Sequence, residues 1–275
     1  MRSLVTVKLG GAVDVEACLD DVAAHAAAGR SVVLVHGGGA EADRLAGELG
    51  RPPRHATSAS GVRSRVTDAA ALDILSMALA GRVKPRLVAG LARRGVRAAG
   101  LTGADGGTVV AARKTALKVR EAGRVRVVRG DLSGRVARVE PRLLEALVGA
   151  GFVPVLSPPG LGPEGPLNVD ADRMAAAVAA ALGAGALVLL TDVPGLLADP
   201  SDPRSLIPRL DPAGPDAEAA ARGRMRHKVI AAREAAEAGV SRVVIADGRR
   251  RAPLTDALAG AGTAVLVREP QEVSR

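Results

Sequence analysis

Two short apolar segments that each end in glycine constrain the fold of this chain more than any other feature. They are residues 5–11, VTVKLGG, and residues 31–39, SVVLVHGGG. Neither alternates polar with apolar residues, which is typical of strands that are buried on both faces of a parallel sheet. An Ala-rich amphipathic pattern at residues 15–29 predicts the helix that joins them. The chain therefore opens with a βαβ unit, and we expect a doubly wound α/β sheet.

The glycines also indicate a binding site. They leave backbone N–H groups unobstructed, and residues 40–49 after HGGG have the apolar spacing of a helix, so loop and helix N-terminus together can bind an anion. Lys8 adds a positive charge at the same sheet edge. A tight turn is the alternative, and neither GxxxxGK(S/T) nor GxGxxG is present in these segments. We hypothesise phosphate chemistry at this edge.

The composition excludes several functional classes. A chain of 275 residues can bury a large core and form one large α/β domain or two lobes. Phe152 is the single Phe, Tyr or Trp, so base stacking is not a means of holding nucleic acid. No apolar stretch reaches the roughly 18 residues of a membrane span, and no signal-peptide pattern follows Met1. We expect a cytoplasmic protein without membrane association.

Cysteine and histidine usage predicts no metal centre. The single cysteine, Cys18, cannot form an internal disulfide, and its helical setting predicts a small buried side chain. His25, His36, His55 and His227 lack the spacing of metal ligands, so no structural zinc is expected.

The formal net charge of +9 needs an explanation. Nucleic acid, a small anionic substrate and an acidic protein partner would each account for it, as would a solvated arginine-rich surface. Basic residues cluster at 63–65, 113–129 and 249–251, with no arginine-rich tail and no nucleic-acid motif. The solvated surface is a sufficient explanation, and an acidic macromolecular partner is worth testing.

The middle of the chain mixes loops, helices and short strands. Residues 51–65 lack apolar periodicity and predict a loop or short hairpin that could cover the substrate. Thr67 is expected to cap a helix over 68–82, after which Pro85 kinks it or opens a second segment. Residues 96–101 predict another buried strand. An antiparallel excursion is expected over residues 108–112, 125–129 and 136–139, followed by a helix over 141–149.

A lobe boundary is predicted after the next core strand, residues 152–156. The following segment, 157–166, contains four prolines and three glycines. Asp170 and Asp172 then precede an Ala-rich helix, where carboxylates interact favourably with the helix dipole, although ordinary N-capping is equally possible. Further strands are expected at 186–190, 243–246 and 263–267. Two helices are expected among them, a long one containing GRMRHKV and a short one over 254–260.

Taken in order, the segments VKLGG, VHGGG, SRVTD, LNVDAD, LTDVPGLL and GRMRHKV resemble the amino-acid kinase family, and within it the acetylglutamate kinase group. GVRSRVTD and ARKTALKVREAGRVRVVRGDLSGRV are similar to the kinases that phosphorylate an aminoadipyl or glutamyl group carried on a LysW-type amino-group carrier protein. The resemblance implies a three-layer αβα sandwich with a mostly parallel central sheet and two lobes. Residues 1–165 would bind the acyl substrate and residues 166–275 would bind ATP.

The resemblance also assigns roles by position. Lys8 and Lys228 resemble the lysines that stabilise the transferring phosphoryl group, and Asp172 the aspartate that orients both. Asp170 departs from the asparagine that is usual in acetylglutamate kinases, which mildly favours the carrier-linked group. The implied substrate-binding residues are Gly37, Gly38, Gly39, Arg65 and Asn168. The implied nucleotide-binding residues are Lys8, Gly10, Gly11, Asp192, Val193, Pro194, Gly195, Leu196, Leu197, Met225 and Lys228.

The implied activity is a phosphotransferase with a carboxyl group as acceptor, which forms an acyl phosphate in lysine, or arginine and ornithine, biosynthesis. A carboxylate is ionised at neutral pH and needs no general base, so the lack of a histidine or serine dyad is consistent with this chemistry. ATP with its Mg²⁺ would be the donor, and an acidic LysW-type carrier the partner. The resemblance, together with the start of the chain directly at the first strand, favours a homodimer.

Three alternatives stay open at the level of sequence. The nearest is an acetylglutamate kinase that acts on free N-acetylglutamate. The second is a catalytically silent sensor of ATP and an amino acid, which the presence of Lys8, Lys228 and Asp172 disfavours. The third, nucleic-acid binding, is supported by the net charge alone.

Overall fold

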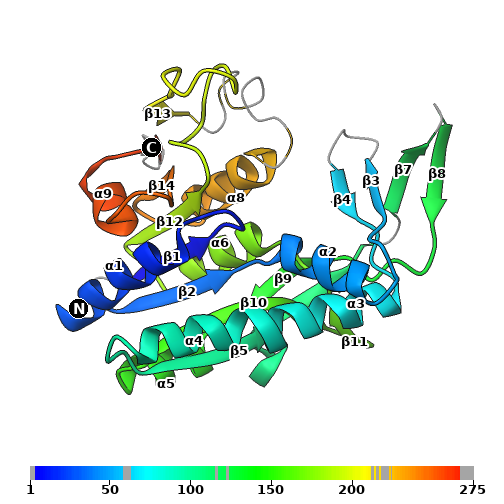
Figure 1. Cartoon of the computed structure of the whole chain (residues 1–275), viewed down its shortest axis with the longest axis horizontal. Coiled ribbons are helices and arrows are strands. Elements are labelled where there is room, and N and C mark those ends of the chain that lie inside the picture. The colour runs from blue at the N-terminus through cyan, green and yellow to red at the C-terminus, as the bar shows by residue number, and fades with distance from the viewer. Residues whose placement is uncertain are drawn as a thin grey trace, which may run out of the picture.

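The chain folds around one large, mostly parallel sheet (Figure 1). The structure is a computed structural model and describes residues 4–57, 63–114, 117–121, 124–211, 214, 217, 223 and 225–266. In those residues the strands are β1 Val5–Leu9, β2 Val32–His36, β3 His55–Thr57, β4 Arg63–Arg65, β5 Ala98–Gly103, β6 Val109–Arg113, β7 Leu117–Glu121, β8 Arg124–Val128, β9 Gly134–Val139, β10 Val153–Gly162, β11 Gly165–Leu167, β12 Ala186–Thr191, β13 Arg209–Leu210, β14 Val243–Asp247 and β15 Thr263–Val265.

Helices cover both faces of that sheet. Their bounds are α1 Val15–Ala27, α2 Gly39–Glu48, α3 Ala69–Ser76, a π-helical segment η1 Met77–Val83, α4 Lys84–Ala92, a short 3-10 turn η2 Asp105–Gly107, α5 Arg142–Gly149, α6 Ala171–Ala181, α8 Met225–Glu237 and α9 Pro253–Ala259. Buried side chains of α1, α4 and α9 pack on one face, and those of α5, α6 and α8 on the other. The predicted three-layer α/β sandwich is therefore confirmed (Figure 1).

The sheet has 11 strands in the order β13-β15-β14-β12-β1-β2-β10-β6-β9, with β5 and β11 also paired to β10. Strands β1, β2, β12 and β14 lie at the centre and pair in parallel, as expected for fully buried strands. Antiparallel pairs occur towards the margins, where β15 joins β14 and β9 joins β6. The parallel strands bring the end of β1 and the end of β2 to one edge of the sheet.

Two local expectations were wrong, the Thr67 cap and the burial of the strand at 96–101. The helix after the hairpin begins at Ala69, and its cap is Asp68, whose side chain accepts a hydrogen bond from the Ala71 N–H. Thr67 instead uses its hydroxyl to accept from Asn168. Of the two outcomes expected at Pro85, the second is found: the proline lies in the first turn of α4, which opens a second segment after η1. Strand β5 is only half-buried, since it pairs with β10 alone.

The proline-rich segment at the predicted lobe boundary is part of the sheet. Strand β10 extends through Gly162, and β11 folds back on it. Its prolines are tolerated because the pairing with β5 ends at Ser157 and the pairing with β6 is at Leu161, so Pro158 and Pro159 lie where β10 changes partners. The division into lobes at residue 165 stays a prediction.

Two hairpins project from the same end of the molecule. Residues 51–65, expected as a loop or hairpin, form β3–β4, and the basic segment that follows β6 forms β7–β8. Strands β3 and β7 contact each other, so the hairpins stand side by side (Figure 1). The side chains of Arg63 and of residues 115–126, part of the predicted basic clusters, lie outside the described part of the structure.

Two other expectations concern single features. Cys18 is buried, as predicted, and its thiol points to the Gly248 carbonyl at 3.5 Å.

No helix in the described part of the chain has the length and apolar character needed to cross a membrane.

Candidate active site

The alternation of β1 places Lys8 on the face of the sheet that α6 and α8 cover. Val5, Val7 and Leu9 point to the opposite face and pack among the side chains of α1, α4 and α9. Lys8 therefore points towards the start of α6, where Asp172 lies in the first turn. The Lys8 Nζ is 2.8 Å from the Asp172 Oδ1. This contact joins the first strand to the start of α6, which are far apart in the sequence.

Lys228 on α8 completes the cluster from the other side. Its Nζ lies 3.0 Å from the Asp172 Oδ2 and 3.3 Å from the Oδ1, so one carboxylate holds both ammonium groups. The exposed fractions of Lys8, Asp172 and Lys228 are 6%, 6% and 7%. Such a cluster carries one positive charge in excess in a shielded place, which is where a cation acts most strongly on an anionic reactant.

The two lysines respond differently to this environment. Burial and the neighbouring Lys8 ammonium lower the pKa of Lys228, against the opposing effect of Asp172. Burial also acts against the charged form of Lys8, but the Asp172 carboxylate outweighs it and raises the pKa of Lys8.

Contacts between α6 and α8 fix the geometry of the cluster. The Arg173 Nε donates to the Glu234 Oε2 at 2.9 Å, which ties the two helices together beside the site. Asp170 caps α6 by accepting from the Arg173 N–H, and its Oδ2 lies 3.1 Å from the Nδ1 of His227. The hydrogen bond with Asp170 raises the pKa of His227. Electrostatic contact with His227 and the Arg173 N–H hold the pKa of Asp170 below its usual range, although burial opposes them.

The HGGG loop lies beside this cluster. A Cβ on Gly37 would be 3.8 Å from the Cβ of Ala171, so the loop reaches the first turn of α6. Helix α2 begins at Gly39, and its N-cap, Gly38, has no side chain to satisfy the N–H groups of the first turn. These groups are free to bind an anion, as the sequence suggested.

The predicted substrate residues Arg65 and Asn168 lie around the same loop. The Arg65 Nη2 donates to the Gly39 carbonyl at 3.1 Å. The same nitrogen lies 2.6 Å from the Asp43 Oδ1 and forms an ion pair with it, at an angle that does not make a hydrogen bond. Asn168 donates from its side chain to the Thr67 Oγ1 at 3.0 Å. Buried Asp131 accepts from the Thr67 N–H and orders this loop. The structure thus brings both predicted residues to the carboxyl edge of the sheet.

The predicted nucleotide residues lie at the ends of β1 and β12. The Gly10 N–H donates to the Leu190 carbonyl at 3.0 Å, and a Cβ there would approach that oxygen to 2.7 Å, so only glycine fits. Gly11 is exposed and open. After β12, Asp192 is exposed and Val193 and Pro194 are half-buried.

The second half of the TDVPGLL segment is held in the core. The side chains of Leu196 and Leu197 are buried, so only their backbone could face a nucleotide. The Thr263 Oγ1 accepts from the Leu196 N–H at 2.9 Å, and a Cβ on Gly195 would approach that oxygen to 2.7 Å. Met225 opens α8 and packs on the same core.

Two charged partners in the site were missed from sequence. His227, which pairs with Asp170, directly precedes Lys228 in GRMRHKV, and that adjacency was the available signal. Asp43 lies one helical turn after Gly39, on the face that Arg65 meets.

Comparison with known proteins agrees with this geometry. Residues 3–247 match the profile of the Amino acid kinase family. The chain belongs to the amino acid kinase family. The "[LysW]-aminoadipate kinase" of Deinococcus radiodurans is 46% identical over 96% of this chain and 91% of its own length. The enzyme of the same name from Thermus thermophilus is 45% identical over 95% of this chain and all of its own.

Other known proteins are also similar to this chain. The "Acetylglutamate kinase" of Rubrobacter xylanophilus is 44% identical, with 98% of each chain covered. The solved structure of smu.665 from Streptococcus mutans superposes with a TM-score of 0.77 at 25% identity, covering 98% of this chain and all of that one. The family and the fold predicted from the motifs are therefore confirmed.

Proposed function

We propose that this amino acid kinase transfers the γ-phosphoryl group of ATP to the side-chain carboxylate of an aminoadipyl or glutamyl group, which a LysW-type carrier protein presents. The observation that carries the proposal is the buried pair of lysines on one aspartate, beside a glycine loop with free N–H groups. The names of the relatives from Deinococcus radiodurans and Thermus thermophilus support the substrate. The similarity to an acetylglutamate kinase supports free N-acetylglutamate as the second candidate.

The chemistry needs charge neutralisation more than proton transfer. The acceptor carboxylate is already ionised, so its attack on the γ-phosphorus is opposed mainly by repulsion between two anions and by the need for in-line placement. Lys8 and Lys228 would face the transferring phosphoryl group, while Asp172 keeps both ammonium groups pointed inward. The product is an acyl phosphate and ADP, and no proton is gained or lost by the protein in the step.

The co-substrate would be ATP with its own Mg²⁺. Gly10 brings the end of β1 close against the end of β12, and Gly11 beside it has open space, where phosphate oxygens and a hydrated ion would bind. The backbone of residues 192–197 and Met225 would form the rest of the nucleotide site. The magnesium ion would neutralise the phosphate oxygens during transfer.

Three further properties belong to the same proposal. The family resemblance supports a homodimer, with residues 1–165 and 166–275 as the acyl and ATP lobes, and the sequence composition supports a location in the cytoplasm. Light scattering of the purified protein measures the mass and tests the homodimer.

The function is tested by supplying the acceptors separately. A coupled assay of ADP release compares the carrier charged with aminoadipate, the carrier charged with glutamate, and free N-acetylglutamate. We expect kcat/KM to be highest with a charged carrier. A higher value with free N-acetylglutamate would favour the second candidate instead.

Arg65 gives a prediction about substrate binding. An Arg65→Ala variant should raise the KM for the acyl acceptor by about 10- to 100-fold, the effect of losing a charge-assisted hydrogen bond, with a smaller change in kcat. Steady-state kinetics with the charged carrier measures both. Asp43→Asn is the control, because it breaks the Arg65–Asp43 pair and leaves the guanidinium free. An unchanged KM in Arg65→Ala would remove Arg65 from the substrate site.

The basic surface gives a prediction about the carrier. Arg51, Arg54 and Arg65 line a pocket of about 220 Å³ beside the β3–β4 hairpin, where Asp68 is the sole acidic lining residue. If an acidic carrier docks there, its KM should rise several-fold between about 0.05 and about 0.3 M salt, because screening shortens the reach of exposed charges. The KM for ATP should change less. Equal salt dependence of the two KM values would count against electrostatic docking.

A further inference from the structure

Lys84, at the start of α4, is a buried lysine without a counter-charge. Its exposed fraction is 6%, like that of Lys8 and Lys228. Those two share Asp172, whereas no carboxylate of the described residues lies within ion-pair distance of Lys84. Asp105 is close enough to attract it, but the Asp105 Oδ2 already accepts from the N–H and hydroxyl of Thr102. Burying an unpaired cation costs folding free energy, so a functional role for Lys84 is a reasonable explanation of its presence.

The side chain of Lys84 lies against strand β5. A Cβ on Gly100 of β5 would lie 2.9 Å from the Lys84 Cδ and 3.1 Å from its Cγ, so the absence of a side chain there makes room for the lysine. The charge of Lys84 contributes to the lowered pKa of His36 at the end of β2, and Asp105 just beyond β5 partly offsets the effect of burial on the pKa of Lys84. Its ammonium is therefore within electrostatic reach of the end of β2, where the HGGG segment begins.

His36 shows that this place lacks polar partners. Its Nδ1 is 2.8 Å from the Gly37 carbonyl and donates to it, whereas its Nε2 is buried without any hydrogen bond. Burial, opposed by that hydrogen bond and helped by the Lys84 charge, lowers the pKa of His36 to about 4. The ring is therefore neutral and offers Lys84 no charge compensation.

The π-helical segment η1 holds Lys84 against the loop. Leu79 and Val83 of η1 pack so closely under Gly38 that a Cβ there would approach them to 2.5 and 3.2 Å. A π turn changes the direction of the following side chains and is frequent at functional sites. Lys84 is the first residue after η1, so the segment that packs under the glycine loop leads directly into the lysine.

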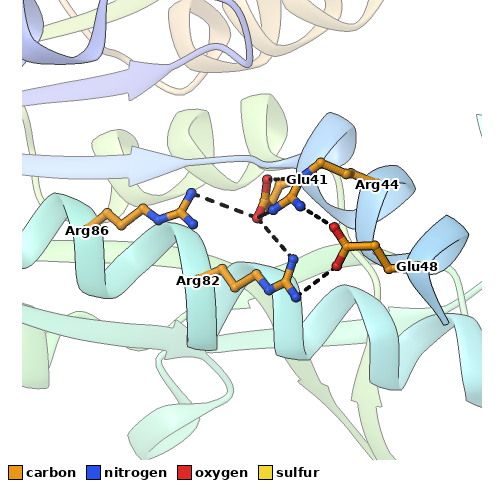
Figure 2. Close-up of polar contacts among 5 residues, drawn as sticks. All are labelled: Glu41, Arg44, Glu48, Arg82 and Arg86. Atoms are coloured by element: carbon orange, nitrogen blue, oxygen red, sulfur yellow. Dashed lines mark hydrogen bonds and ion pairs between the residues drawn. The ribbon is translucent and has the colours of Figure 1, made fainter.

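An outer set of ion pairs fixes η1 and α4 to the helix that carries the loop (Figure 2). Glu41 and Glu48 of α2 lie between Arg44 of the same helix and two arginines from the neighbouring segments. The Arg82 Nη2 is 3.0 Å from the Glu48 Oε2, and the Arg86 Nη1 is 3.9 Å from the Glu41 Oε1. Arg82 and Arg86 are thus paired with carboxylates at the surface. Lys84, which lies between them in the sequence, is buried and has no such partner among the described residues.

We propose that Lys84 is a positioning residue whose ammonium compensates the acceptor's carboxylate when the glycine loop receives it. This inference rests on the proposed function, since it takes the acceptor to be a carboxylate. In the free protein Lys84 has no counter-charge among the described residues. The carboxylate of the bound acceptor would supply it. Lys84 thus adds a third cation, on the face of the sheet opposite to Lys8 and Lys228, and acts through binding of the acceptor.

The test compares Lys84→Met with a matched variant, Arg93→Met, which removes an exposed cation at the far end of the same helix, where it pairs with Glu16 of α1 at 3.9 Å. We expect Lys84→Met to raise the KM for the carrier loaded with its amino acid at least tenfold with little change in the KM for ATP, and Arg93→Met to leave both near wild type. The melting temperature of free Lys84→Met should equal or exceed that of wild type, because an unpaired buried charge is gone. A lower melting temperature with an unchanged acceptor KM would assign Lys84 a structural role and overturn the proposal.

Proton uptake gives a second readout. Burial lowers the pKa of Lys84 to about 8, so part of the lysine is neutral at that pH and should take up a proton when a carboxylate binds. Titration calorimetry of the charged carrier in buffers of different ionisation enthalpy should show uptake near pH 8 in wild type and less in Lys84→Met. Equal uptake in both would contradict the inference. Failure of the proposed function would look different: wild type itself would release no ADP with any acceptor. Failure of the inference about Lys84 alone would leave the wild-type activity intact.

Discussion

Replacing Lys8 or Lys228 with alanine is expected to reduce kcat by about 10² to 10³, or roughly 3 kcal/mol, the loss seen when one preorganised donor to a transition state is removed. Each variant loses one of the two ammonium groups that Asp172 holds. The remaining lysine still neutralises Asp172, so the fold should be retained. Initial rates of ADP release with the charged carrier, together with circular dichroism, measure both.

Arg233→Ala is the control for these two variants. Arg233 lies on the same helix as Lys228 and forms an exposed ion pair with Glu237 at 3.7 Å. Its substitution removes one positive charge without changing the lysine cluster. Its kcat should stay within a few-fold of wild type. Full activity in Lys8→Ala or Lys228→Ala would refute the assignment of that lysine.

Asp172→Asn should have the largest effect on stability. It removes the one carboxylate that both lysines share, leaving two buried ammonium groups to repel each other without compensation. Breaking a buried ion cluster in this way typically costs about 3 to 5 kcal/mol, which we expect as the decrease in the free energy of unfolding at neutral pH. Urea denaturation measures it, with exposed Asp73→Asn on α3 as the control.

The pH dependence of Asp172→Asn has a definite sign. Without the carboxylate, the pKa of each lysine in the folded state should fall below the value of about 10.4 in the unfolded chain, as burial and Lys8 already do to Lys228. The unfolded chain then binds more protons, so the free energy of unfolding should rise as pH increases from neutrality towards that value. A variant as stable as wild type at neutral pH would show that Asp172 does not hold the lysines.

The sequence predicted those parts of the fold that depend on local patterns. The apolar strands at 5–9 and 32–36, the helix between them and the glycine turn follow from periodicity, and Lys8 follows from its position before the first glycines. The antiparallel excursion was also expected, although β7 was not, because its five residues read as one charged segment with the turn after it.

The rest depends on contacts that no local pattern encodes. Asp172 and Lys228 are far apart in the sequence, and their pairing was implied by the family resemblance alone before the structure brought them within 3.0 Å. Pro158 and Pro159 argue locally against a strand, and only the change of partners along β10 explains why they are tolerated. The π turn before Lys84 and the lack of a counter-charge around it are likewise properties of packing.

The formation of an acyl phosphate is the central claim, and trapping with hydroxylamine tests it most directly. Hydroxylamine converts an acyl phosphate into a stable hydroxamate, which mass spectrometry of the charged carrier detects as a defined mass increase at the terminal acid. We predict that wild-type enzyme with ATP, Mg²⁺ and charged carrier yields hydroxamate in proportion to the ADP released. Release of ADP without any hydroxamate would contradict the account.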